Sequence, residues 1–171
     1  MQAYQIFQKI PPELTVEILT AIREKDRAIY KTSIGSLASQ KRLRPIFIQK
    51  KPLDQQMQWA HKTLQLKLCD ELGEQLLQVW LLGCHSGVLV EFLDEVGIAH
   101  DGEGSVDDLP EELDAAKLRA GVDKLFAGHD PSLVTIYLHM FQLQRPGGWK
   151  ELGELIETDE RLSFGNSKSE S

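Results

Sequence analysis

The side chains best suited to chemistry, by type and spacing, are the cations of one short stretch. They are Lys41, Arg42, Arg44, Lys50 and Lys51, which flank the apolar triplet Ile46-Phe47-Ile48. Lys and Arg bind phosphate groups by releasing condensed counterions, and an aromatic ring such as Phe47 can stack on a base. The stretch over 41–51 is therefore predicted to bind a polyanion or a protein partner. The alternative is a solvated segment that pairs with acidic residues elsewhere in the chain.

An acidic stretch from His100 to Asp108 carries oxygen ligands at a spacing that suits a cation. Counting Asp101 as position one of a calcium-binding loop places Glu103 at position three. Further oxygen-bearing side chains fall at positions five, seven and twelve: Ser105, Asp107 and Glu112. The pattern fails at position six, because the sharp turn there requires glycine and the residue is Val106. The alternative is an acidic loop that leads into a helix, since acidic side chains favour a helix N-terminus.

The histidines suggest a third chemistry, which is metal binding. They are His61, His85, His100, His129 and His139, and none shows a close metal-binding spacing such as H-E-x-x-H. If the turns at His85 and His129 are equivalent, these two residues and Asp130 are candidate ligands or site residues. Asp101 and Glu103 are the other candidate metal ligands. Nucleophile and nucleotide-binding motifs are absent, so no catalytic residue and no cofactor is predicted.

Helical spacing of apolar residues dominates the chain and decides where these polar groups lie. Residues 53–83 are predicted to form one long helix, or two helices broken near Cys69. The glycines at both ends of 83–87 predict a tight turn. Only Pro45–Ile48 has strand-like composition. Because this segment is short and isolated, we expect it to cross the protein in an extended conformation.

Helix signals are clearest towards the C-terminal end of the chain. Asp130 can cap a helix, and Pro131 suits the first helical position. The nearly all-apolar stretch 133–143 that follows predicts a buried central helix. Trp149 comes after Pro-Gly-Gly, and we expect it to staple the last helix onto the body of the protein. The alternative is that it forms an exposed interface anchor.

These patterns predict an all-α protein, a multi-helix bundle of about six to seven helices. The similarity of His85–Val96 to His129–Met140, at an offset of 44 residues, makes a two-helix repeat an alternative description. We expect a single α-helical domain over 1–165 and a disordered tail over 166–171.

Charge divides the expected domain into a basic part, 1–67, and an acidic part, 68–165. Residues 1–67 hold 12 of the 19 Lys and Arg but only five of the 26 acids. Two cysteines are too few for a disulfide framework, and the first residues lack a signal-peptide pattern. No apolar run reaches the ~18 residues of a membrane span. We therefore expect a cytoplasmic protein with no membrane partner.

The helical pattern, the opposed charges and the missing catalytic motifs favour a non-enzymatic helical protein-interaction or regulatory domain. Its partner would be another protein or a second copy of the chain. Binding of RNA or DNA through 41–51 is an alternative, although the isoelectric point is unusually low for a nucleic-acid-binding domain. A small metal-dependent enzyme that uses the histidines or the acidic loop is a third hypothesis.

Overall fold

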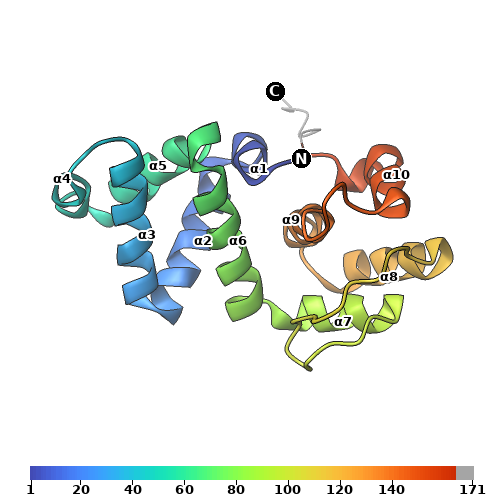
Figure 1. Ribbon diagram of the computed structural model, residues 1–171. Coiled ribbons are helices and arrows are strands. Elements are labelled where there is room, and N and C mark those ends of the chain that lie inside the picture. The colour runs from blue at the N-terminus through green and yellow to red at the C-terminus, as the bar shows by residue number, and fades with distance from the viewer. Residues whose placement is uncertain (165–171) are drawn as a thin grey trace. The chain divides into compact units, whose positions relative to one another are not determined.

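The computed structural model describes residues 1–164, and every regular element within them is a helix (Figure 1). The predicted all-α class is therefore confirmed. The described residues form ten α-helices and two 3-10 helices, more than the six or seven expected, because several are very short. The chain divides into two compact units, Met1–Cys84 and His85–Ser171, here termed the first and the second unit. A single domain over 1–165 and the two-helix repeat stay predictions, and the tail expected over 166–171 lies outside the described residues.

Six α-helices and one 3-10 helix make up the first unit. They are α1 (Ala3–Lys9), α2 (Pro12–Lys25), α3 (Arg27–Gln40), α4 (Pro45–Gln49), α5 (Leu53–Leu64), η1 (Lys67–Cys69) and α6 (Asp70–Cys84). Helix α2 contacts α3, α5 and α6, and its Ile18, Leu19 and Ile22 are almost completely buried. Burying a side chain of this kind contributes about 1.5–3 kcal/mol. Helix α2 is therefore the element around which the first unit packs.

The segment expected to be extended at Pro45–Ile48 is instead part of the short helix α4, so that prediction was wrong. Pro45 takes the first helical position, where its missing N–H removes no intrahelical bond. Ile48 points inward and is only 3% exposed, whereas Ile46 and Phe47 are exposed. The apolar composition of this segment therefore reflects one buried side chain and two outward ones, not a strand.

Residues 53–83 form two α-helices rather than one, and the break lies at residues 65–69. The 3-10 helix η1 occupies that break, and Cys69 at its end is fully buried. Asp70 begins α6, and its Oδ1 accepts a hydrogen bond of 3.0 Å from the backbone N–H of Tyr4. The predicted break near Cys69 is thus confirmed.

The turn expected over 83–87 is reduced to a single residue. Helix α6 continues through Cys84, and α7 (Ser86–Val96) begins directly after His85. His85 is the N-cap residue of α7, with φ −136° and ψ 30°. Both glycines of this stretch lie in helices, in open space and at ordinary negative φ. The predicted break within 83–87 is therefore confirmed, but it consists of His85 alone, and neither glycine lies in it.

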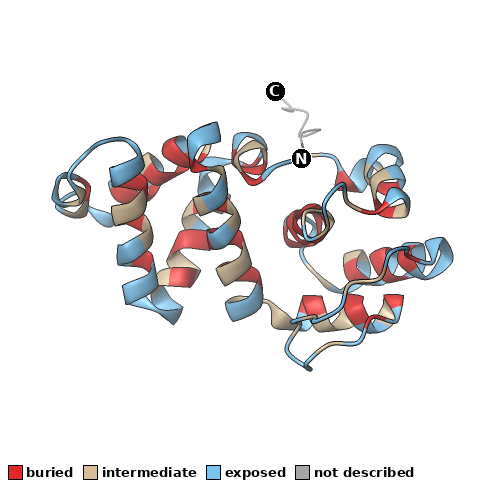
Figure 2. Cartoon of the chain, in the orientation of Figure 1, coloured by how far each residue is buried: buried red, intermediate tan, exposed pale blue. Residues whose placement is uncertain are grey.

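The second unit consists of four α-helices and a short 3-10 helix. They are α7, α8 (Ala115–Gly128), α9 (Pro131–Gln142), α10 (Lys150–Thr158) and η2 (Glu160–Leu162). Every residue of α9 from Leu133 to Phe141 is buried, and the helix, seen nearly end-on in Figure 2, is drawn mostly in red. Asp130 caps α9 by accepting hydrogen bonds from the backbone N–H groups of Ser132 and Leu133. The predicted helix start and buried central helix are both confirmed.

Trp149 joins the end of the second unit to its body, as expected of a staple. Its ring stacks on Phe141, with centroids 4.6 Å apart and planes inclined by 8°. Its Nε1 donates a hydrogen bond of 2.9 Å to the carbonyl of Pro110, and the side chain is 1% exposed. Phe92 meets Phe141 edge-on from α7. An exposed interface role for Trp149 is excluded by this burial.

Candidate functional site

The predicted basic segment forms a projection between α3 and α5, which we call the knuckle (residues 41–53, including α4; Figure 1). Its anchor is the buried side chain of Gln56 on α5. Nε2 of Gln56 donates hydrogen bonds to the carbonyls of Gln49 and Lys51, at 3.0 and 2.7 Å. Oε1 accepts one of 3.0 Å from the hydroxyl of Tyr30, whose pKa is raised by burial, so the phenol stays protonated. Hydrogen bonds from a buried side chain therefore hold the backbone of the knuckle in place.

The outer face of the knuckle combines apolar and basic side chains. The exposed apolar residues are Leu43, Ile46, Phe47 and Leu53. The basic residues are the five predicted ones, Lys41, Arg42, Arg44, Lys50 and Lys51, and all are exposed. None of these five makes an ion pair within residues 1–84. The structure thus places the predicted cations around an exposed apolar tip, and their pairing with the acidic part of the chain stays a prediction.

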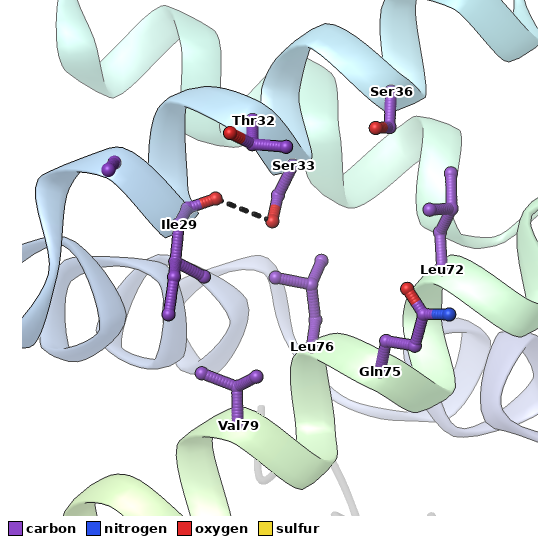
Figure 3. A pocket seen from close by; sticks show the side chains of 9 residues that line it. Ile29, Thr32, Ser33, Ser36, Leu72, Gln75, Leu76 and Val79 are labelled. Atoms are coloured by element: carbon purple, nitrogen blue, oxygen red, sulfur yellow. Dashed lines mark hydrogen bonds between the residues drawn. The ribbon is translucent and has the colours of Figure 1, made fainter.

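A second surface feature of the first unit is a groove of about 320 Å³ between α3 and α6 (Figure 3). Helix α3 contributes one wall with mostly small side chains: Ala28, Ile29, Thr32, Ser33 and Ser36. Helix α6 contributes the other wall with larger ones: Leu72, Gln75, Leu76 and Val79. Ile29, Leu76 and Val79 gather at one end of the groove in Figure 3. No lining residue carries a charge.

The groove is open to solvent along both walls. Ile29 of α3 is 37% exposed and Gln75 of α6 is also exposed, whereas Leu76 is buried. Leu82 lies outside the groove, three residues beyond Val79 on α6, and is 44% exposed. Oγ of Ser33 donates a hydrogen bond of 2.8 Å to the carbonyl of Ile29 (dashed in Figure 3), so this hydroxyl is satisfied within its own helix. Sequence reasoning identified none of these residues as functional. The signal that could have found them is the recurrence of small residues every four positions on α3.

The acidic loop of the second unit is held by hydrogen bonds between its own residues. Oδ1 of Asp101 accepts the backbone N–H groups of Glu103 and Ser105, at 2.8 and 3.0 Å. These bonds hold the pKa of Asp101 below its usual range. Gly104 has a φ of +101°, and a Cβ at this position would lie 2.8 Å from Cβ of Leu89. The carboxylate proposed to begin a calcium loop is therefore bonded to the backbone, and Glu103 is exposed.

His85, His129 and Asp130 lie within electrostatic range of one another, at the ends of α7, α8 and α9. Burial and the nearby His129 lower the pKa of His85, and Asp130 acts in the opposite direction. Nε2 of His129 lies 2.6 Å from Oε2 of Glu91. Among the residues that the structure describes, no three His, Cys, Asp or Glu side chains are placed to hold a metal ion. The metal-site hypothesis stays a prediction for which the described residues supply no ligand set.

Two further histidines belong to the cores of the units. Nδ1 of His61 lies 2.8 Å from Oγ1 of Thr15, and its Nε2 lies 2.8 Å from the amide of Gln65. Nε2 of His139 lies 2.8 Å from the carbonyl of Leu162, to which it donates. Burial lowers the pKa of both histidines. Both are therefore neutral structural residues near pH 7.

Comparison with known proteins gives no match to a family model, to a curated protein or to a solved structure. Within residues 1–164 no single helix is long and apolar enough to cross a membrane. The successive helices Lys67–Cys84 and Ser86–Val96 pass as a pair by length and composition only. The knuckle and the groove of the first unit are therefore the candidate functional surfaces.

Proposed function

We propose that the chain is a non-enzymatic helical interaction domain that associates with a second copy of itself. The contact would be the α3–α6 face, defined as the groove residues together with Leu82. The observation that carries this proposal is the complementarity of the two walls, one with small side chains and the other with large aliphatic ones. The cytoplasmic location expected from the sequence belongs to the same proposal, since Cys69 and Cys84 are free thiols.

A two-fold axis would bring the same patch of two copies together, with each contact made twice. About such an axis, α6 of one copy packs against α3 of the other. The aliphatic side chains of Leu72 and Val79 then face the small wall that contains Thr32. Small side chains let two helices approach closely, and large side chains from the neighbour fill the space between them. Both walls of the groove would be covered in one step.

The uncharged character of the face supports a second copy as the partner. The chain has a net charge of −7, so two copies repel each other at long range. The groove residues add no charge to the contact, and burying their apolar surface contributes about 25 cal/mol per Å². Added salt screens the repulsion and leaves the burial intact. Association is therefore expected to persist or strengthen at high salt, unlike a contact between the basic and acidic parts.

Size-exclusion chromatography with light scattering, at low and high salt, tests this proposal. Thr32→Arg places a cation on the exposed small wall and Leu72→Glu places an anion on the aliphatic wall, and each is expected to leave a monomer. Leu53→Glu is the matched control, because Leu53 is an exposed leucine outside the groove. Circular dichroism confirms that each variant is folded. A wild-type monomer at every salt concentration, or a dimer that Thr32→Arg leaves intact, would contradict the proposal.

A further inference from the structure

We propose that the knuckle binds the surface of a membrane containing anionic lipids, with Ile46 and Phe47 entering the headgroup region. This inference uses other residues than the α3–α6 face and does not depend on self-association. No apolar run of the sequence is long enough to span a bilayer, and no membrane partner was therefore expected. A peripheral contact needs no span, only an apolar surface flanked by cations.

The cations of the knuckle suit an anionic lipid surface. Three lie before the apolar tip in the sequence and two after it, and all are exposed. None is neutralised by an ion pair within residues 1–84. The first unit holds twelve Lys and Arg against eight acids, so its charge is positive although that of the chain is negative. Each cation close to an anionic leaflet strengthens binding by about fivefold.

The apolar tip of the knuckle suits insertion between lipid headgroups. Ile46 is 51% exposed and Phe47 is 62% exposed, and they are consecutive residues on the outer side of α4. An aromatic and an aliphatic side chain presented together gain by leaving water for the boundary between headgroups and acyl chains. The hydrogen bonds of Gln56 hold the knuckle backbone in place, so insertion does not first have to order the segment.

The composition of the tip favours lipid over nucleic acid or an acidic protein. Single-stranded nucleic acid binds to aromatic platforms on which bases stack. The knuckle offers one aromatic side chain, Phe47, and three exposed aliphatic ones, which stacking does not use. An acidic protein would need a recess shaped to accept the tip. A lipid layer needs none, because it deforms around a projecting side chain.

Co-sedimentation with vesicles tests the inference on the full chain. The probes are vesicles of phosphatidylcholine alone and of phosphatidylcholine with an equal part of phosphatidylserine. The protein is expected to sediment only with the mixed vesicles, and less so as salt rises. Phe47→Ser should weaken binding several-fold without changing the salt dependence. The pair Lys50→Gln and Lys51→Gln should weaken it by about fivefold per charge and flatten the salt dependence.

Leu68→Ser is the matched control, because Leu68 is an exposed leucine of the first unit outside the knuckle, and it should bind as the wild type does. All substituted side chains are exposed, so the fold is expected to survive. Failure to sediment with mixed vesicles at low salt would overturn the inference. The inference would also be overturned by two results found together: no preference for anionic vesicles, and binding of a single-stranded RNA oligonucleotide that Phe47→Ser leaves unchanged. The dimer variants test different residues, so either proposal can fail alone.

Discussion

The two units differ in net charge, in exposed apolar side chains and in ion pairing. The first unit has twelve Lys and Arg against eight acids, and the second has seven against eighteen. All the large apolar side chains that are exposed in the described residues lie in the first unit. Every ion pair that forms within one unit belongs to the second, again among the described residues. The more highly charged unit is therefore the one that pairs its charges internally.

Arg161 shows how the second unit completes its own surface. Its guanidinium lies 2.6 Å from Asp159 and 2.7 Å from Asp123, and 4.7 Å above the ring of Phe126. Within residues 1–84, the knuckle cations and the groove walls make no comparable ion pairs. Exposed apolar surface beside unpaired charge is typical of a region that a partner covers. Both of our interaction proposals therefore fall on the first unit.

The largest loss of stability is expected from removing a buried aromatic side chain of the second unit. Trp149→Ala removes a ring stacked on Phe141 and a buried hydrogen bond to Pro110. It is expected to lower the free energy of unfolding by about 3–5 kcal/mol, as measured by urea denaturation. Trp59→Ala is the matched change at a half-buried tryptophan of the first unit and should cost clearly less. Equal losses would contradict the difference in packing between these two positions.

A smaller effect is expected at the one buried polar clamp of the knuckle. Gln56→Ala leaves the carbonyls of Gln49 and Lys51 and the hydroxyl of Tyr30 without this partner. The expected loss is about 2–3 kcal/mol in urea denaturation, with faster amide exchange over the knuckle. Tyr30→Phe removes only one of these bonds and should cost about 1 kcal/mol. If exchange over the knuckle is unchanged in Gln56→Ala, the clamp does not hold this segment.

Lowering the pH should reduce the stability of both units, because each buries a neutral histidine. Burial lowers the pKa of His61 in the first unit and of His139 in the second. The unfolded chain takes up these protons near pH 6.5 while the folded chain does not. Stability that is complete above this pH is therefore lost as the pH falls towards the lowered pKa values of the folded state. Urea midpoints between about pH 7.5 and about pH 5 measure this loss.

His139→Gln tests the histidine of the second unit separately. The amide nitrogen of glutamine can replace Nε2 as the donor to the carbonyl of Leu162, but it does not titrate in this range. The variant should therefore show a flatter pH dependence than the wild type. An unchanged pH dependence would remove His139 as a source of the acid sensitivity.

The smallest effect should come from the ion pairs themselves. Arg161→Gln breaks the pairs with Asp159 and Asp123 and is expected to cost about 0.5–1 kcal/mol at low salt, because the side chain is half exposed. The cost should shrink as salt rises. Lys25→Gln is the control in the first unit, where Lys25 has no ion pair within its unit, and its stability should not change measurably. A salt-independent loss in Arg161→Gln would assign its effect to packing on Phe126 instead.

Elements decided by local residues could be predicted from the sequence. Asp130 caps α9 and Pro131 takes its first position, so the helix start depends on these two residues alone. The apolar stretch that follows them is buried because it has no polar face. Pro45–Ile48 was mispredicted because β-branched and aromatic residues favour strands. The first-turn proline and the burial of Ile48 decide the conformation instead, so tertiary packing outweighs propensity at this position.

The knuckle and the groove also differ in whether residues close in the sequence form them. The knuckle cations are close neighbours in the sequence, so their shared surface could be predicted. The groove exists only because α3 and α6, distant in the sequence, lie side by side. Taken alone, Thr32 belongs to an ordinary solvated helix face and Leu72 to an ordinary apolar stripe. The recurrence of small residues on α3 indicates one wall of the groove, but no pattern within one helix predicts that α6 supplies the other.

One turn of α3 takes part in both surfaces. Tyr30 reaches the knuckle through Gln56, and its neighbour Ile29 lines the groove. If binding at one surface changes binding at the other, thermodynamic linkage requires the reciprocal effect to be equal in size. The two surfaces thus share two consecutive residues of one helix, so measuring dimerisation with and without anionic vesicles shows whether they are coupled.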